Sequence, residues 1–77
     1  MNNENYKINN LKKYKIYEIK FIDENKKYNV YLNLPIEKSN KKLINKFKNR
    51  KVKIKYIYST DQLKTAEEMA IDFKKII

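Results

Sequence analysis

The chain has 77 residues and a formal net charge of +10, and it contains no cysteine, histidine, tryptophan or glycine. A chain of this length forms one small domain with a thin core. Its composition excludes disulfides, thiolate chemistry, histidine-based catalysis and the glycine-rich loops that bind nucleotide phosphates. No cluster of carboxylates with metal-ligand spacing is visible either. We therefore expect a binding protein and not an enzyme, without a metal ion or a cofactor.

Residues 1–10 are rich in asparagine and lack a hydrophobic period, which predicts a flexible tail ahead of a single α+β domain at residues 11–77. Residues 14–22 place apolar side chains at every second position from Tyr17 to Phe21, which predicts a first strand. One face of that strand is apolar and is expected to point into the core. It carries Tyr17, Ile19 and Phe21.

A polar turn at residues 23–27 joins the first strand to the second, so the two strands form a hairpin. With no glycine available, Asn25 is the residue expected at positive φ, because asparagine tolerates the left-handed region. Residues 28–34 alternate cleanly, which predicts the second strand. In that strand Tyr31 and Asn33 are expected to point away from the core.

Residues 39–48 have the apolar spacing of a short helix, which Ser39 or Asn40 is suited to cap. Residues 51–58 alternate lysine with apolar residues and give the clearest strand pattern in the chain. From about residue 63 onward, apolar side chains recur at helical spacing to the end of the chain, which predicts a C-terminal helix.

The predicted order of elements is strand, strand, helix, strand, helix, which we interpret as a small ββαβα domain. Its simplest architecture is a three-stranded, mainly antiparallel sheet with two helices on one face, which leaves the other face open. The expected core comprises Tyr17, Ile19, Phe21, Val30, Leu32, Leu43, Phe47, Val52, Ile54, Met69 and Phe73.

The positive charge is concentrated in the middle of the chain. From Lys38 to Lys55 there are nine basic residues and no acidic one. Such clustering is typical of a surface that binds nucleic acid. An alternative explanation for the total charge is codon bias, because lysine, asparagine, isoleucine and tyrosine all have A/T-rich codons. Codon bias would spread lysine along the chain, however, and would not by itself remove acidic residues from this segment.

The favoured hypothesis is a small accessory protein that binds DNA or RNA, mainly through the phosphate backbone. Lysine neutralises phosphates, asparagine adds hydrogen bonds, and exposed tyrosine stacks on unpaired bases. The candidate residues lie on the open face of the sheet and on the short helix, whose adjacency the sequence leaves open. They are Lys20, Tyr31, Asn33, Lys41, Lys42, Lys46, Lys48, Arg50, Lys51, Lys53 and Lys55.

Two other interpretations remain open. One is an inhibitor or adaptor, encoded by a phage or mobile element, that binds a host protein or ribonucleoprotein complex through its basic surface or through an exposed strand. The other is a homodimer that pairs edge strands or packs Ile76 and Ile77 across a symmetry axis. The sequence has no apolar run long enough to cross a bilayer and no pattern of a signal peptide at its start, so we expect a cytoplasmic protein without a membrane partner.

Overall fold

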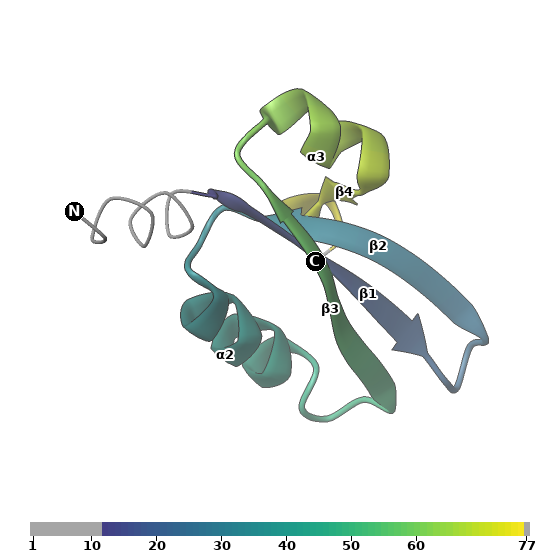
Figure 1. Cartoon of the computed structure of the whole chain (residues 1–77). Helices are drawn as coiled ribbons and strands as arrows, with labels where there is room; N and C mark the ends of the chain where they lie inside the picture. The colour runs from purple at the N-terminus through teal and green to yellow at the C-terminus, as the bar shows by residue number, and fades with distance from the viewer. Residues whose placement is uncertain (1–11, 77) are drawn as a thin grey trace.

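Four strands form one mixed sheet in the computed structural model, which describes residues 12–76 (Figure 1). They are β1 (Tyr14–Phe21), β2 (Lys26–Leu32), β3 (Val52–Thr60) and β4 (Ile71–Asp72). In the order β3-β1-β2-β4, β1 is antiparallel to both of its neighbours, whereas β2 and β4 are parallel. The α+β class and three antiparallel strands are confirmed, but the prediction of only three strands is wrong. The predicted tail at 1–10 lies outside the described residues.

The turn between β1 and β2 has an asparagine at positive φ, as predicted. Asn25 adopts a φ of 54° and its backbone N–H donates to the carbonyl of Ile22 at 3.4 Å. A short polar side chain tolerates this left-handed conformation, which takes the place that glycine usually fills in a tight turn.

The first helix, α2 (Ile36–Lys46), starts three residues before the predicted helix at 39–48. Pro35 precedes it with φ at −56°, and the carbonyl of Pro35 accepts the first helical hydrogen bond from the Ser39 N–H at 2.9 Å. Ser39 is therefore not the cap that the sequence suggested. Its side chain is buried, and its hydroxyl donates to the carbonyl of Leu34 at 3.2 Å. Leu43 and Phe47 follow one and two turns later and are buried against the sheet.

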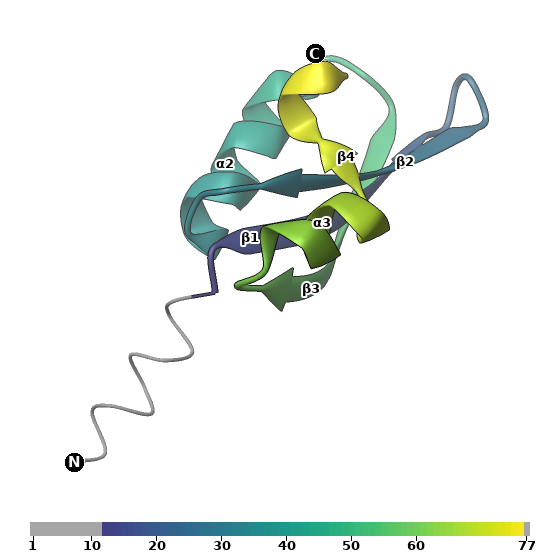
Figure 2. The same ribbon diagram turned by 90° about the horizontal axis from the view of Figure 1, so that it is seen from above.

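The two helices cover opposite faces of the sheet, so the prediction that they share one face is wrong (Figures 1 and 2). On one face, α2 packs over a cluster that contains Tyr17, Ile19 and Phe21 of β1. On the other, α3 (Leu63–Met69) packs over Ile16 of β1 and Tyr31 of β2. Side chains alternate between the faces of a strand. Apolar residues at consecutive positions of β1 therefore need a cover on both sides of the sheet.

The C-terminal segment is not one continuous helix. After α3 the chain becomes extended at Ala70, pairs with β2 as β4, and ends in a 3-10 turn, η1 (Phe73–Lys75). Ala70 belongs to the cluster under α3, whereas Phe73 belongs to the cluster under α2. The chain must cross the edge of the sheet between these two residues, which a straight helix on one face cannot do. The same crossing leaves Met69, a predicted core residue, 39% exposed.

Candidate functional site

A row of lysines crosses three strands at the end of the sheet near the β1–β2 turn. Lys20 on β1 lies opposite Lys27 on β2 and opposite Lys53 on β3. Residues directly opposite one another in a ladder point to the same face, so the three side chains share one face of the sheet. All three are exposed. With strands about 4.8 Å apart, the row spans about 10 Å.

A second row beside the first is less basic. Lys55 lies opposite Glu18, which lies opposite Asn29. The Glu18 carboxylate is 3.6 Å from Nζ of Lys27, so the one acidic group of the two rows is paired within them. We call the four lysines together the basic sheet face, and they are Lys20, Lys27, Lys53 and Lys55. Four positive charges and one negative charge give this surface a net charge of +3.

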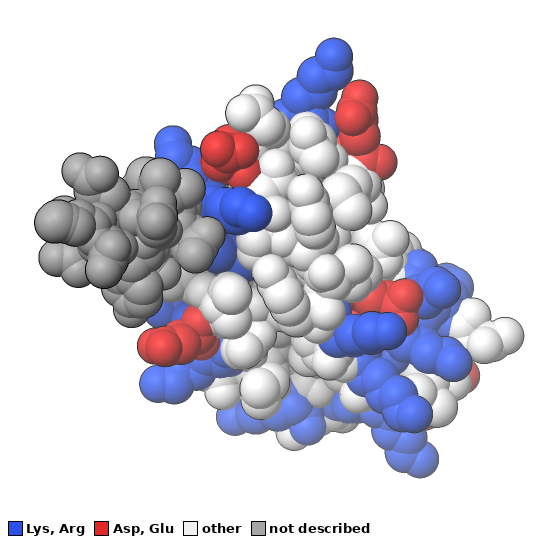
Figure 3. All heavy atoms as spheres, in the orientation of Figure 1, with Lys and Arg blue, Asp and Glu red and all other residues white. Residues whose placement is uncertain are grey.

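The basic sheet face lies on the same side of the sheet as α3 but beyond the end of that helix. Lys20 and Glu18 alternate in step with Ile16, which α3 covers. Viewed toward β3, the molecule has an uncharged area over the middle of that strand, and basic side chains gather toward the β1–β2 turn (Figure 3). The helix itself carries Glu67 and Glu68 as exposed acids. An approaching polyanion is therefore attracted to the open half of this face and repelled by the covered half.

The prediction that Tyr31 is exposed is wrong, because α3 lies over it. Tyr31 is only 8% exposed, and its ring makes an edge-to-face contact with Tyr14 at 5.7 Å between centroids. Burial raises the pKa of Tyr31, and the nearby carboxylates of Asp72 and Glu67 raise that pKa further. A side chain enclosed in this way cannot stack on a base.

Tyr58, and not Tyr31, is the tyrosine exposed on the side of the basic sheet face. Tyr58 on β3 lies opposite Ile16, so it points to the same side as the basic sheet face, and it is 45% exposed. Sequence reasoning missed Tyr58 because it stands at the predicted strand end. It also missed Lys27, which fell in the predicted turn. Correct strand bounds and register bring both residues to this surface.

The lysines predicted on the short helix do not join the basic sheet face. Lys41, Lys42 and Lys46 are exposed on α2, and Lys48 is exposed just after it. Because α2 packs on the opposite face of the sheet, these residues form a second basic surface. The structure therefore separates these helix lysines from Lys20, Lys53 and Lys55, which lie on the other side of the sheet.

Arg50 and Lys51 lie beside the β1–β2 turn. The Arg50 guanidinium pairs with the Glu24 carboxylate, and it stacks 4.6 Å from the centroid of the Phe21 ring. Arg50 therefore links the β1–β2 turn to the segment that precedes β3, with its charge already paired. Lys51 is exposed, and its backbone carbonyl accepts the N–H of Ile22 at 2.9 Å.

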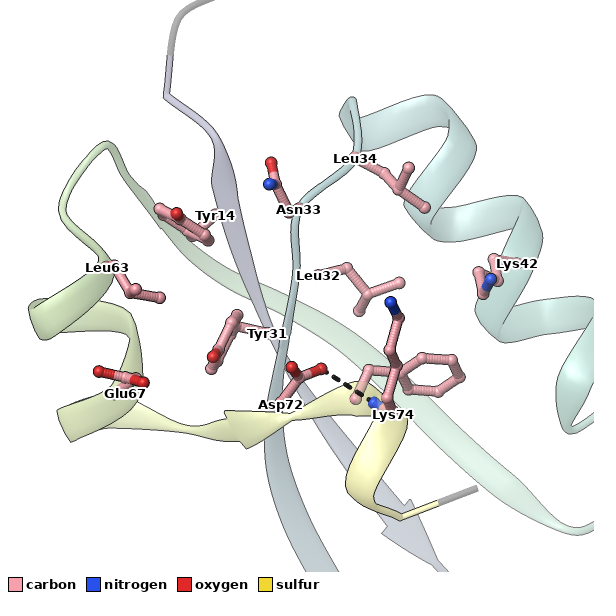
Figure 4. Close-up of a pocket in the computed structure, with 11 residues that line it drawn as sticks. Tyr14, Tyr31, Leu32, Asn33, Leu34, Lys42, Leu63, Glu67, Asp72 and Lys74 are labelled. Atoms are coloured by element: carbon pink, nitrogen blue, oxygen red, sulfur yellow. Dashed lines mark hydrogen bonds between the residues drawn. The ribbon is translucent and has the colours of Figure 1, made fainter.

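Asn33 and Lys42 lie away from the basic sheet face, at a pocket of about 560 Å³ near the other edge of the sheet. In this pocket Tyr31 lies between Glu67 and Asp72 (Figure 4). Oδ1 of Asp72 accepts the backbone N–H of Lys74 at 3.0 Å. Acidic and basic side chains both line the pocket, so its charge does not select one class of ligand.

Within residues 12–76, no group of three or more carboxylate, histidine or cysteine side chains is placed to hold a metal ion. Neither helix in this part of the chain has the length and hydropathy needed to span a membrane. Comparisons with protein-family models, curated proteins and solved structures found no match to the chain.

Proposed function

We propose that this protein binds nucleic acid through its basic sheet face, mainly by contacts to the phosphate backbone. The register of Lys20 between Lys27 and Lys53 carries the proposal. Like charges directly opposite one another destabilise a sheet, so this arrangement costs folding free energy in the absence of an anion. A phosphate backbone relieves that repulsion, and the release of its counterions drives association.

Phosphate contacts of this kind position a nucleic acid without reading its sequence. Tyr58 supports a preference for single strands, because it is exposed on the same side of β3 as Lys53 and Lys55. Unpaired bases stack on such a ring, whereas the bases of a duplex are already stacked on each other. The ligand proposed is therefore a single-stranded DNA or RNA that follows β3 from the lysines toward Tyr58.

Fluorescence anisotropy with labelled single-stranded and duplex DNA and RNA at low salt tests this proposal. The sheet variant Lys20→Gln with Lys53→Gln is compared with the helix variant Lys41→Gln with Lys46→Gln, which loses the same charge. We expect the sheet variant to weaken binding at least about tenfold and the helix variant to change it much less. Equal losses in the two variants, or no binding by the unmodified protein, would refute it.

A further inference from the structure

Strand β3 is an outer strand of the sheet, and its outer edge carries unpaired backbone groups. Lys51 directly precedes β3, and its carbonyl accepts the N–H of Ile22, which directly follows β1. This hydrogen bond shows that the backbone groups of Lys51 point toward β1. Backbone groups alternate sides along an antiparallel strand. The N–H and C=O groups of Val52, Ile54 and Tyr56 therefore point away from β1. Among residues 12–76, no backbone hydrogen bond from another segment reaches this edge.

An apolar groove runs beside this edge, between β3 and α2. It has a volume of about 470 Å³, and its lining includes Ile44 from α2 and Ile54 and Tyr56 from β3. Ile44 is 58% exposed. The Tyr56 ring is held in place by an edge-to-face contact with Tyr17 at 5.6 Å and by a 2.6 Å hydrogen bond between its hydroxyl and that of Ser59. The groove is therefore formed before any partner arrives.

The regular part of the edge is short. Tyr17 pairs with Tyr56 and Ile16 with Tyr58, so Ile57 has no partner on β1 and forms a bulge. A bulge bends its strand and interrupts the ladder. The longest uninterrupted stretch of the ladder therefore runs from Lys51 to Tyr56, and pairing resumes at Tyr58. A stretch of this length suits an added strand of about five or six residues.

We propose that this edge binds an extended segment of another protein in which acidic and apolar residues alternate. An added strand sends alternate side chains to the two faces of the sheet. On the α2 side they meet the apolar groove beside Ile44 and Ile54. On the other side they lie next to Lys53 and Lys55, where carboxylates pair with the lysines. The main chain of the segment hydrogen-bonds to the outward groups of Val52, Ile54 and Tyr56.

A second copy of this chain fits the edge poorly. In an antiparallel pair of β3 strands, residues on the same face must oppose each other, so odd-numbered residues meet odd-numbered residues. Lysines occupy positions 51, 53 and 55, all on one face. Every such register that pairs more than one residue of the segment from Lys51 to Tyr56 therefore sets at least one lysine against a lysine of the other copy. Pairing Ile54 with itself, for example, opposes Lys53 to Lys55. Like charges in this position are destabilising.

Hydrogen exchange followed by NMR tests the proposal with a nine-residue peptide of alternating glutamate and valine. In the free protein we expect slow exchange at the amides of Lys53 and Lys55, which face β1, and fast exchange at those of Val52, Ile54 and Tyr56, which face solvent. We expect the peptide to slow exchange at these three amides at least about tenfold. A peptide with the same residues in a non-alternating order is the control, and it should give no protection. Equal protection by both peptides, or none by either, would overturn the proposal.

Two variants separate this site from the nucleic-acid surface. Ile44→Ala removes part of the groove wall and should weaken peptide binding about fivefold while leaving nucleic-acid binding unchanged. Lys20→Gln with Lys27→Gln should weaken nucleic-acid binding much more than peptide binding, because neither residue borders the edge of β3. Protection of Val52, Ile54 and Tyr56 that rises with protein concentration in the absence of peptide would identify a second copy as the occupant and refute the proposal.

Discussion

Replacing Ile16 by alanine tests whether the two helices cover opposite faces of the sheet. Ile16 is fully buried and packs with Tyr31, Ala66 and Ala70 under α3. Truncating a buried isoleucine to alanine costs about 2–5 kcal/mol, whereas a change on an open sheet face stays within about 0.5 kcal/mol. A 77-residue domain has a total stability of about 4–12 kcal/mol, so Ile16→Ala removes a large share of it.

Urea unfolding monitored by far-UV circular dichroism measures this difference. Ile22→Ala is the matched control, because Ile22 follows the same strand but is 47% exposed, and it should change stability by less than about 0.5 kcal/mol. If Ile16→Ala does not fold, Ile16→Val provides a smaller step of about 0.5–1.5 kcal/mol. If Ile16→Ala and Ile22→Ala destabilise the protein equally, α3 does not cover the face that contains Ile16.

Three further outcomes follow from the same contacts. Lys20→Gln should raise the free energy of unfolding, measured in urea, by about 0.5 kcal/mol at low salt. This gain should disappear in 1 M salt, where the Debye length is only about 3 Å. Burial raises the pKa of Tyr31 above its ordinary value, so its stabilising contribution is complete below about pH 10 and is lost as pH rises through the higher folded-state pKa. Tyr31→Phe should accordingly make unfolding free energies fall less steeply above about pH 10, and an unchanged slope would contradict this. Tyr58→Ala should weaken binding to single strands by about 1–3 kcal/mol in anisotropy titrations and leave duplex binding unaltered.

The antiparallel core of the fold could be predicted from local sequence pattern. The alternation in β1, β2 and β3 identified the strands, and the lack of glycine identified Asn25 as the turn residue. Burial of Tyr17, Ile19 and Phe21 followed from the same alternation. These features depend on the two-residue period of a strand and on which residue types tolerate positive φ. Both can be identified in a single sequence.

The path of the C-terminal segment could not be predicted in this way. The apolar residues from Leu63 to Ile76 fit the period of one helix, yet Ala70 and Phe73 face opposite sides of the sheet. The face that each of these two residues reaches is set by β4, which pairs with the free edge of β2. That edge exists only in the assembled sheet. The burial of Tyr31 has the same origin, because it depends on where α3 lies.

The candidate site, too, could be predicted only in part from the sequence. The concentration of positive charge between Lys38 and Lys55 was visible in the sequence, but the sheet separates that segment into a helical surface and a strand surface. The register of β1 then adds Lys20 and Lys27 to the lysines of β3. Cross-strand neighbours are fixed by register, which composition and charge runs do not specify.

The salt dependence of binding to a single-stranded oligonucleotide tests the central claim most directly. Four lysines on phosphates give a slope of about −3 for log affinity against log salt, since each contact to a single strand contributes about −0.7. Lys20→Gln with Lys27→Gln should reduce the slope to about −1.4, and Lys41→Gln with Lys46→Gln should leave it near −3. An unchanged slope for the sheet pair, together with a reduced slope for the helix pair, would place the nucleic acid on α2 and contradict the account.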